Sequence, residues 1–133
     1  MEQIKMALVE LNRFEENAIA EEIQGYSAEY KNSKWYKKPT IKDVLGVRKA
    51  GHFDMLKKAL SNNDIALIQS YLNIFDEIAK CYGKSWYDED LKCYRTGYEY
   101  ETQLYTTFRN IAAIAIGKPS IDLNTYYEGY GSC

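Results

Sequence analysis

The hydrophobic pattern of this chain is dominated by one apolar run at residues 64–83. Large apolar side chains recur there every three or four residues, which is the period of an α-helix with a wide apolar face. Asp64 can cap the start of this helix by accepting a backbone N–H, and Gly83 suits a left-handed C-terminal cap. Several polar residues within the run make it too hydrophilic to cross a membrane. We therefore predict a core helix over 64–82.

Two longer amphipathic patterns predict a helix toward each end of the chain. Residues 2–24 carry apolar side chains at helical spacing, with mostly glutamates between them. Residues 100–116 show the same period and end at Gly117, with a proline two positions later. The 2–24 pattern also fits two heptads, so self-association through this helix is an alternative to packing on its own core.

Shorter apolar patterns predict two further helices before the central run. Thr40 and Asp43 have the spacing of a capping box, which predicts a helix over 41–50 that Gly51 stops or kinks. A second pattern of the same period predicts a helix over 52–62.

The remaining segments have no clear helical period. A Ser-x-x-Asp spacing suits a helix cap and predicts a short helix over 86–95. A small β-hairpin is an option near 26–36 or 94–100, where aromatic residues are frequent. Residues 118–133 form a Tyr/Gly-rich tail that either lies extended across the domain or stays loose.

Length and composition favour one domain. The chain has 133 residues, of which 46% are hydrophobic and 27% charged, as in ordinary globular proteins. Together with the pattern, these values predict a mainly α, compact single-domain bundle over 1–133, with five to six helices around the 64–82 helix and room for a small β-hairpin. Neither an export signal nor a membrane or lipidation signal is recognised, and three scattered cysteines suit a reducing compartment. We therefore expect a cytoplasmic protein that does not bind membranes.

Charge is distributed unevenly along the chain, although the net charge is only −2. Residues 1–29 carry seven acidic side chains against two basic ones, and residues 30–49 carry seven basic against one acidic. The chain also contains thirteen tyrosines, whose rings and hydroxyls suit half-buried positions and interfaces alike. A solvated basic face that pairs with the acidic first helix is the plainest interpretation of the charge pattern.

We predict that the basic aromatic region, with two tyrosines of the tail, binds a partner. The predicted binding residues are Lys34, Trp35, Tyr36, Lys37, Lys38, Lys42, Arg48, Lys49, Tyr126 and Tyr127. Lysine and arginine beside aromatic rings suit an acidic protein surface, a phosphate backbone or stacked bases. A protein partner is the leading expectation, and the size and composition fit a small adaptor, regulator or inhibitor of phage-like type.

Nucleic acid is the alternative partner. The segment 41–47 (Ile-x-x-x-Leu-Gly-Val) is similar to the first helix and turn of a helix-turn-helix. The resemblance implies a DNA-binding regulator spanning 40–57, with 49–57 as the recognition helix. Lys42 and His52 depart from that pattern, which has a small residue and a β-branched apolar residue at the corresponding places.

The sequence contains no recognisable catalytic or metal-binding motif. With His52 as the only histidine, Ser-His-Asp or Cys-His chemistry would depend on that residue, which is expected to lie at a helix cap or on the surface. Cys81 is expected to be buried and inert, and nothing in the sequence places a base beside Cys93. Neither zinc-type spacings, a calcium loop nor a glycine-rich phosphate loop occurs. We therefore expect a non-enzymatic protein without a metal or other cofactor.

Overall fold

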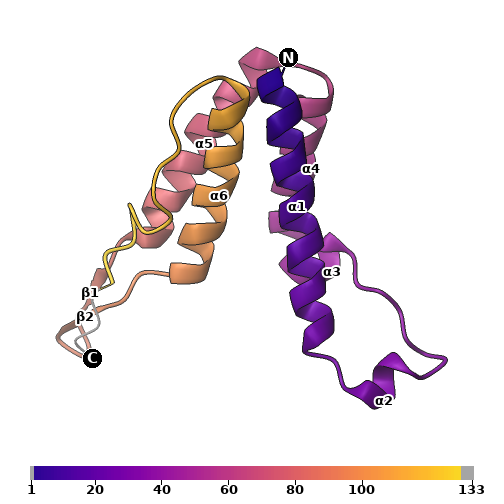
Figure 1. Cartoon of the computed structure of the whole chain (residues 1–133). Helices are drawn as coiled ribbons and strands as arrows, with labels where there is room; N and C mark the ends of the chain where they lie inside the picture. Colours follow the sequence, from indigo (N-terminus) through magenta and orange to yellow (C-terminus); the bar gives the residue numbers. More distant parts are fainter. Residues whose placement is uncertain (1, 130–133) are drawn as a thin grey trace.

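In the computed structural model, which describes residues 2–129, the helices form two arms that meet at one end and diverge at the other (Figure 1). Within these residues the elements are α1 (Glu2–Gln24), α2 (Ala28–Lys31), α3 (Ile41–Leu45), α4 (Val47–Ser61), α5 (Ile65–Gly83), β1 (Trp86–Asp88), β2 (Cys93–Arg95) and α6 (Glu99–Ala115). One arm contains α1, α3 and α4, and the other contains α5, α6 and the β-hairpin. The prediction of a mainly α bundle with five to six helices and a small hairpin is confirmed.

Aromatic rings from four helices pack together in the core. Phe108 of α6 is fully buried. Its ring centroid lies 5.5–6.3 Å from the rings of Phe14, Phe53, Phe75 and Tyr105. Because these rings come from α1, α4, α5 and α6, one cluster links all the long helices, and tilted or edge-on ring pairs of this kind add to the stabilisation from burial.

The centre of the bundle is the α5–α6 pair, in which α6 is the more buried helix. Helix α5, predicted as the central element, leaves Ile65 and Ile74 about half exposed. Helix α6 buries even polar side chains. The hydroxyls of Thr102 and Thr106 donate to the backbone carbonyls four residues earlier, which satisfies them without a partner from another helix.

The interruption between α3 and α4 lies at Gly46, not at Gly51 as predicted. Gly46 has a φ of +86°, a conformation that favours glycine over residues with a side chain. Helix α4 continues through Gly51, where an added Cβ would meet nothing within 4 Å. The predicted capping box is confirmed, because Thr40 and Asp43 exchange hydrogen bonds between side chain and backbone.

The predicted helix over 86–95 is wrong, because this segment is an antiparallel β-hairpin. The carboxylate of Asp88 accepts hydrogen bonds from the backbone N–H groups of Asp90 and Leu91. The Ser-x-x-Asp spacing that suggested a helix cap therefore serves a turn, a position that aspartate also favours. The other segment considered for a hairpin, 26–36, contains α2 instead.

The residues after α6 return along the α5–α6 pair, and we call 118–129 the C-terminal strap (Figure 1). Gly83 lies within α5 and does not form the predicted left-handed cap. A Cβ at Gly83 would lie 2.1 Å from the carbonyl oxygen of Tyr126, so glycine is needed here for close approach of the strap. Residues 130–133 of the predicted tail lie outside the described part of the chain.

Candidate partner-binding surface

The connection between α1 and α3, residues 25–40, lies at the free end of the first arm, and we call it the basic aromatic loop (Figure 1). Tyr26, Tyr30 and Tyr36 pack edge to face with ring centroids 5.2–6.5 Å apart. The hydroxyl oxygen of Tyr30 also accepts a hydrogen bond from the backbone N–H of Lys37, at 3.3 Å. Aromatic packing therefore orders a segment whose sequence has no helical period.

Two serines organise the backbone of the same loop. Ser27 caps α2 by accepting the N–H of Tyr30 at 3.1 Å. The hydroxyl of Ser33 donates to the carbonyl of Tyr30 at 2.8 Å and accepts the N–H of Trp35 at 3.2 Å. These local bonds satisfy backbone groups that a short helix leaves unpaired, so the position of Trp35 is set by its own neighbourhood.

Trp35 projects from this ordered loop. Its side chain is 76% exposed, and the ammonium of Lys34 lies 5.2 Å from its ring centroid. The loop carries four lysines and one glutamate, and Lys37 and Lys38 are also exposed. An exposed indole on a prearranged, positively charged loop is typical of an interaction site, because tryptophan contributes large binding energies when buried by a partner.

The predicted binding residues of α3 and α4 do not all belong to this surface. Lys42 and Arg48 are exposed. Lys49 is half-buried, forms an ion pair with Glu101 at 3.3 Å, and lies 5.2 Å from the ring centroid of Tyr100. Because Glu101 and Tyr100 belong to α6, Lys49 links the two arms of the protein.

The helix-turn-helix resemblance over 40–57 is matched only in part. Helix α3 is five residues long, and a single glycine, Gly46, separates it from α4, whereas the motif has a turn of roughly three to four residues. Residues 49–57 lie within the long helix α4, where Phe53 and Leu56 face the core.

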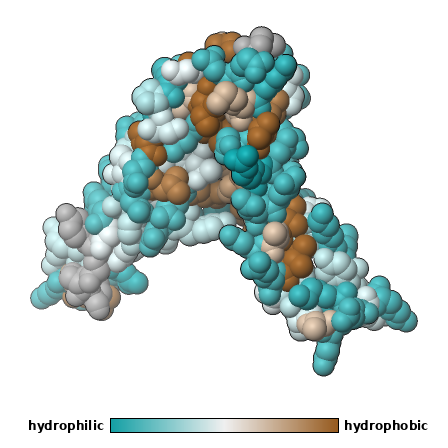
Figure 2. Space-filling model, in the orientation of Figure 1, coloured by the Kyte–Doolittle hydropathy of each residue, from teal (hydrophilic) through white to brown (hydrophobic). Residues whose placement is uncertain are grey.

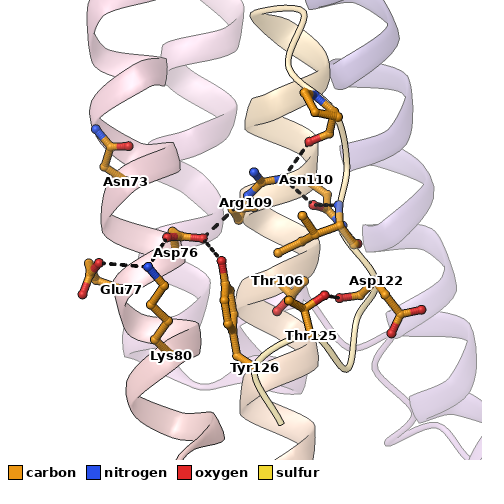
Figure 3. A network of polar contacts seen from close by, with 12 residues as sticks. Asn73, Asp76, Glu77, Lys80, Thr106, Arg109, Asn110, Asp122, Thr125 and Tyr126 are labelled. Atoms are coloured by element: carbon orange, nitrogen blue, oxygen red, sulfur yellow. Dashed lines mark hydrogen bonds and ion pairs between the residues drawn. The ribbon is translucent and has the colours of Figure 1, made fainter.

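Tyr126, predicted to bind a partner, instead holds the C-terminal strap against α5 (Figure 3). Its hydroxyl donates to the carboxylate of Asp76 at 2.5 Å. Asp76 also forms ion pairs with Lys80 at 3.0 Å and with Arg109 at 3.8 Å. Tyr127 is half-buried. Replacement of Tyr126 is therefore expected to affect stability, which the sequence did not indicate.

Two side chains of α6 hold the earlier part of the strap (Figure 3). Arg109 donates to the carbonyl of Pro119 at 2.9 Å. The side-chain amide of Asn110 donates to the carbonyl of Ile121 at 2.8 Å and accepts its N–H at 3.0 Å. Asn110 thus pairs with both backbone groups of one residue, as a neighbouring strand would.

The network at Asp76 makes stability depend on pH in a defined direction. Burial by itself would raise the pKa of Asp76, but hydrogen bonds from Tyr126 and Lys80 and the nearby Arg109 charge hold that pKa below its usual value. A carboxylate whose pKa is lower in the folded than in the unfolded state stabilises the fold above the unfolded pKa of about 4. This stabilisation is lost as the pH falls through the folded pKa.

We expect Asp76→Asn to lower the unfolding free energy by about 1 kcal/mol at neutral pH. The variant should also lose less stability than the wild type as the pH falls below about 4. Urea unfolding at a series of pH values measures both effects. Tyr126→Phe, which keeps the ring but removes one hydrogen bond to Asp76, should show an intermediate slope. An acid slope equal to the wild type in Asp76→Asn would contradict this account.

His52 has a structural partner in the core. Its Nδ1 lies 2.6 Å from the hydroxyl of Tyr105, which is fully buried. Burial raises the pKa of Tyr105, so the phenol keeps its proton. Burial, with a smaller contribution from Arg48, lowers the pKa of His52. Both shifts favour the uncharged forms of the two rings, whose hydrogen bond links α4 to α6.

The cysteines also differ from the sequence-based expectation. Cys81 is an exposed free thiol on α5, not a buried one, and Cys93 is disulfide-bonded. Within residues 2–129 no group of three or more His, Cys, Asp or Glu side chains is placed to hold a metal ion. The same residues include no helix with the length and apolar character needed to cross a membrane.

The two arms border a groove of about 580 Å³ between α1, α3 and α6, visible as the hollow between the arms in Figure 2. Phe14, Leu104 and Leu123 supply apolar side chains to its wall, and Glu21 and Glu22 supply negative charge. Its mixed lining gives no indication of one ligand class. The chain has no significant match among protein-family models, curated proteins or solved structures.

Proposed function

We propose that this protein is a small, non-enzymatic protein-binding module and that the basic aromatic loop is its binding surface. The observation that carries the proposal is Trp35, 76% exposed on a loop ordered by three packed tyrosines. A loop that is ordered before binding loses less conformational entropy on association. The four lysines of the loop favour a partner with an acidic surface and an apolar pocket for the indole.

We expect Trp35→Ala to weaken partner binding by about 30-fold or more, in line with the loss of a tryptophan anchor. Immobilised wild-type protein and the variant are compared by capture from cell lysate and by titration of the captured protein. Trp86 offers a matched control, because it is also exposed but belongs to the hairpin of the other arm, where it stacks on Tyr98. Trp86→Phe should leave capture unchanged. Equal capture by wild type and Trp35→Ala would refute the proposal.

The Trp86→Phe variant also provides a direct optical measurement. The chain has two tryptophans, so Trp35 is the only one left in this variant. Its fluorescence should resemble that of an indole in water and shift to shorter wavelength when the captured partner is added. A spectrum that does not change at saturating partner would place the interface elsewhere.

Nucleic acid is the second candidate partner. It is favoured by Lys42 of α3 and Arg48 of α4, which are exposed on the arm that carries the basic aromatic loop. Trp35 could stack on an unpaired base, as aromatic residues do in single-strand binding proteins. Labelled single-stranded and duplex DNA and RNA are titrated at about 50 and 200 mM salt, where contacts to phosphates give a steep loss of affinity. Binding that is steeply salt-dependent and lost in a Lys38→Ala/Lys42→Ala variant would favour this candidate. Absence of binding at the lower salt would eliminate it.

A further inference from the structure

Helix α5 carries a second apolar face that the described residues cover only in part. The side chains of this face, which we call the α5 seam, are Leu67, Tyr71, Ile74, Ile78 and Cys81, spaced by four, three, four and three residues. Leu67 is 38% and Ile74 45% exposed, Tyr71 and Ile78 are partly buried, and Cys81 is exposed. A different set of α5 residues, Ile68, Leu72, Phe75 and Ala79, faces the core.

The spacing of the α5 seam is that of a coiled coil. Alternating spacings of four and three residues place the seam residues in one stripe along the helix. Such a stripe can pack against a second helix with the same repeat. The sequence suggested self-association through helix 2–24, but the heptad residues Ile4, Ala7 and Leu11 of α1 are buried in the core. The apolar heptad repeat that remains partly exposed, and could therefore contact a second copy, is the one on α5.

Charges of opposite sign border the C-terminal half of the α5 seam. A shallow pocket of about 450 Å³ there is lined by Ile78, Cys81, Tyr82, Tyr98, Arg48 and Glu77. Arg48 comes from the neighbouring helix α4, and Glu77 from α5 itself. Glu77 is 72% exposed, and among residues 2–129 its one ion pair is with Lys80, at 3.5 Å, a contact that contributes little at a surface.

We propose that the α5 seam is the interface of a symmetric dimer, in which α5 packs parallel to α5 of a second copy. In this arrangement each seam residue meets its own counterpart. The two-fold axis then brings Arg48 of one subunit opposite Glu77 of the partner subunit, and the same pair forms again on the other side. Because the apolar repeat and the opposite charges complement themselves, a second copy is the occupant that fits this face.

The parallel arrangement has a chemical signature at Cys81. Two in-register helices bring the two Cys81 thiols together at the dimer axis. An antiparallel pair would place Cys81 opposite Leu67, which lies fourteen positions earlier in the chain, about 21 Å along a helix. Disulfide formation between subunits therefore distinguishes the two arrangements.

The first test is oxidation of the full-length protein with copper–phenanthroline. The two thiols release two protons to solvent and pass one electron to each of two copper(II) complexes, which become copper(I), and the two sulfurs form one S–S bond. We expect a covalent dimer on a non-reducing gel for the wild type and none for Cys81→Ser, which corrects for cross-links through other cysteines. Light scattering should give a dimer mass for both. A dimer mass without a Cys81-dependent cross-link would overturn the parallel arrangement, and a monomer mass at every concentration would overturn the proposal.

The second test uses matched substitutions on one helix. Ile74→Asp places a charge in the α5 seam and should raise the dimer dissociation constant by about 100-fold or more. Ile65→Asp is the control, because Ile65 is also exposed, at 52%, but lies outside the seam. If Ile74→Asp dimerises as well as Ile65→Asp, the seam is not the interface.

Exchanging the charges of Arg48 and Glu77 tests whether these two side chains pair across the dimer axis. Arg48→Glu and Glu77→Arg should each weaken the dimer, because each brings like charges together across the axis. The double variant restores opposite charges and should recover the wild-type dissociation constant. Failure of the double variant to recover, with both single variants weakened, would overturn the proposed Arg48–Glu77 pairing.

The dimer and the proposed binding function can be separated experimentally. Trp35→Ala leaves the α5 seam unchanged and should keep the dimer mass. A dimer would also present two copies of the basic aromatic loop, so a partner with two sites would bind more tightly than a partner with one. Ile74→Asp should remove this gain while keeping the affinity of a single loop.

Discussion

Replacement of Phe108 by alanine is expected to lower the unfolding free energy by about 4 kcal/mol, the cost of emptying a large aromatic site. Phe108 is fully buried, and its neighbours belong to four helices that cannot all move inward together. The cavity should therefore persist. A loss of this size is a large fraction of the roughly 5–15 kcal/mol by which domains are usually stable.

Chemical unfolding followed by circular dichroism measures this loss for Phe108→Ala. Trp35→Ala is the control, because it also removes an aromatic ring but from a side chain that is 76% exposed. Its stability should stay within about 0.5 kcal/mol of the wild type. If Phe108→Ala cost no more than the control, the aromatic cluster would not be the centre of the core.

Replacement of Gly97 by alanine is expected to destabilise the protein by about 3 kcal/mol, although it adds only one methyl group. The new Cβ would lie 2.4 Å from the carbonyl oxygen of Gly83 and 3.0 Å from that of Tyr82. These atoms are fixed, because the Tyr82 carbonyl accepts the N–H of Tyr98 and the Gly83 carbonyl accepts the N–H of Glu128. The added methyl group must therefore separate α5 from the start of α6 or displace the strap.

Gly51→Ala is the matched control for this experiment. Gly51 lies inside α4 with nothing within 4 Å of an added Cβ, so alanine should stabilise the helix by about 0.5–1 kcal/mol. Both variants are compared by urea unfolding. Opposite signs would confirm that close backbone approach sets the requirement for glycine at position 97, and equal effects would contradict it.

Helices α1, α5 and α6 could be predicted from the sequence because their signals are local. The apolar repeats over 2–24, 64–82 and 100–116 recur within each helix, and Thr40 and Asp43 form their capping box within four residues. Such interactions need no information about distant parts of the chain. The hairpin at 86–95 was missed because one aspartate spacing fits both a helix cap and a β-turn, and pairing with a second strand decides between them.

The sequence predicted where the exposed basic aromatic loop lies, but it did not show which of the predicted binding residues have partners within the chain. Charge and aromatic content indicated the region of Trp35, and Trp35 is exposed there. Lys49 and Tyr126, predicted for the same role, are engaged with Glu101 and Asp76. Those partners lie 52 and 50 positions away in the chain. No local sequence pattern could therefore reveal that the two side chains already bind other residues of the same chain.

By itself, then, the sequence determined α1, α5 and α6, the caps at Thr40 and Asp64, and an unusual basic aromatic segment, because these depend on side chains a few positions apart. The tertiary structure alone decided which apolar face of α5 enters the core and which stays exposed as the α5 seam. It also decided that Gly83 and Gly97 permit close contact between segments and that the C-terminal strap is held by Asp76, Arg109 and Asn110. The physical reason is that burial and long-range polar contacts depend on which segments the folded chain brings together.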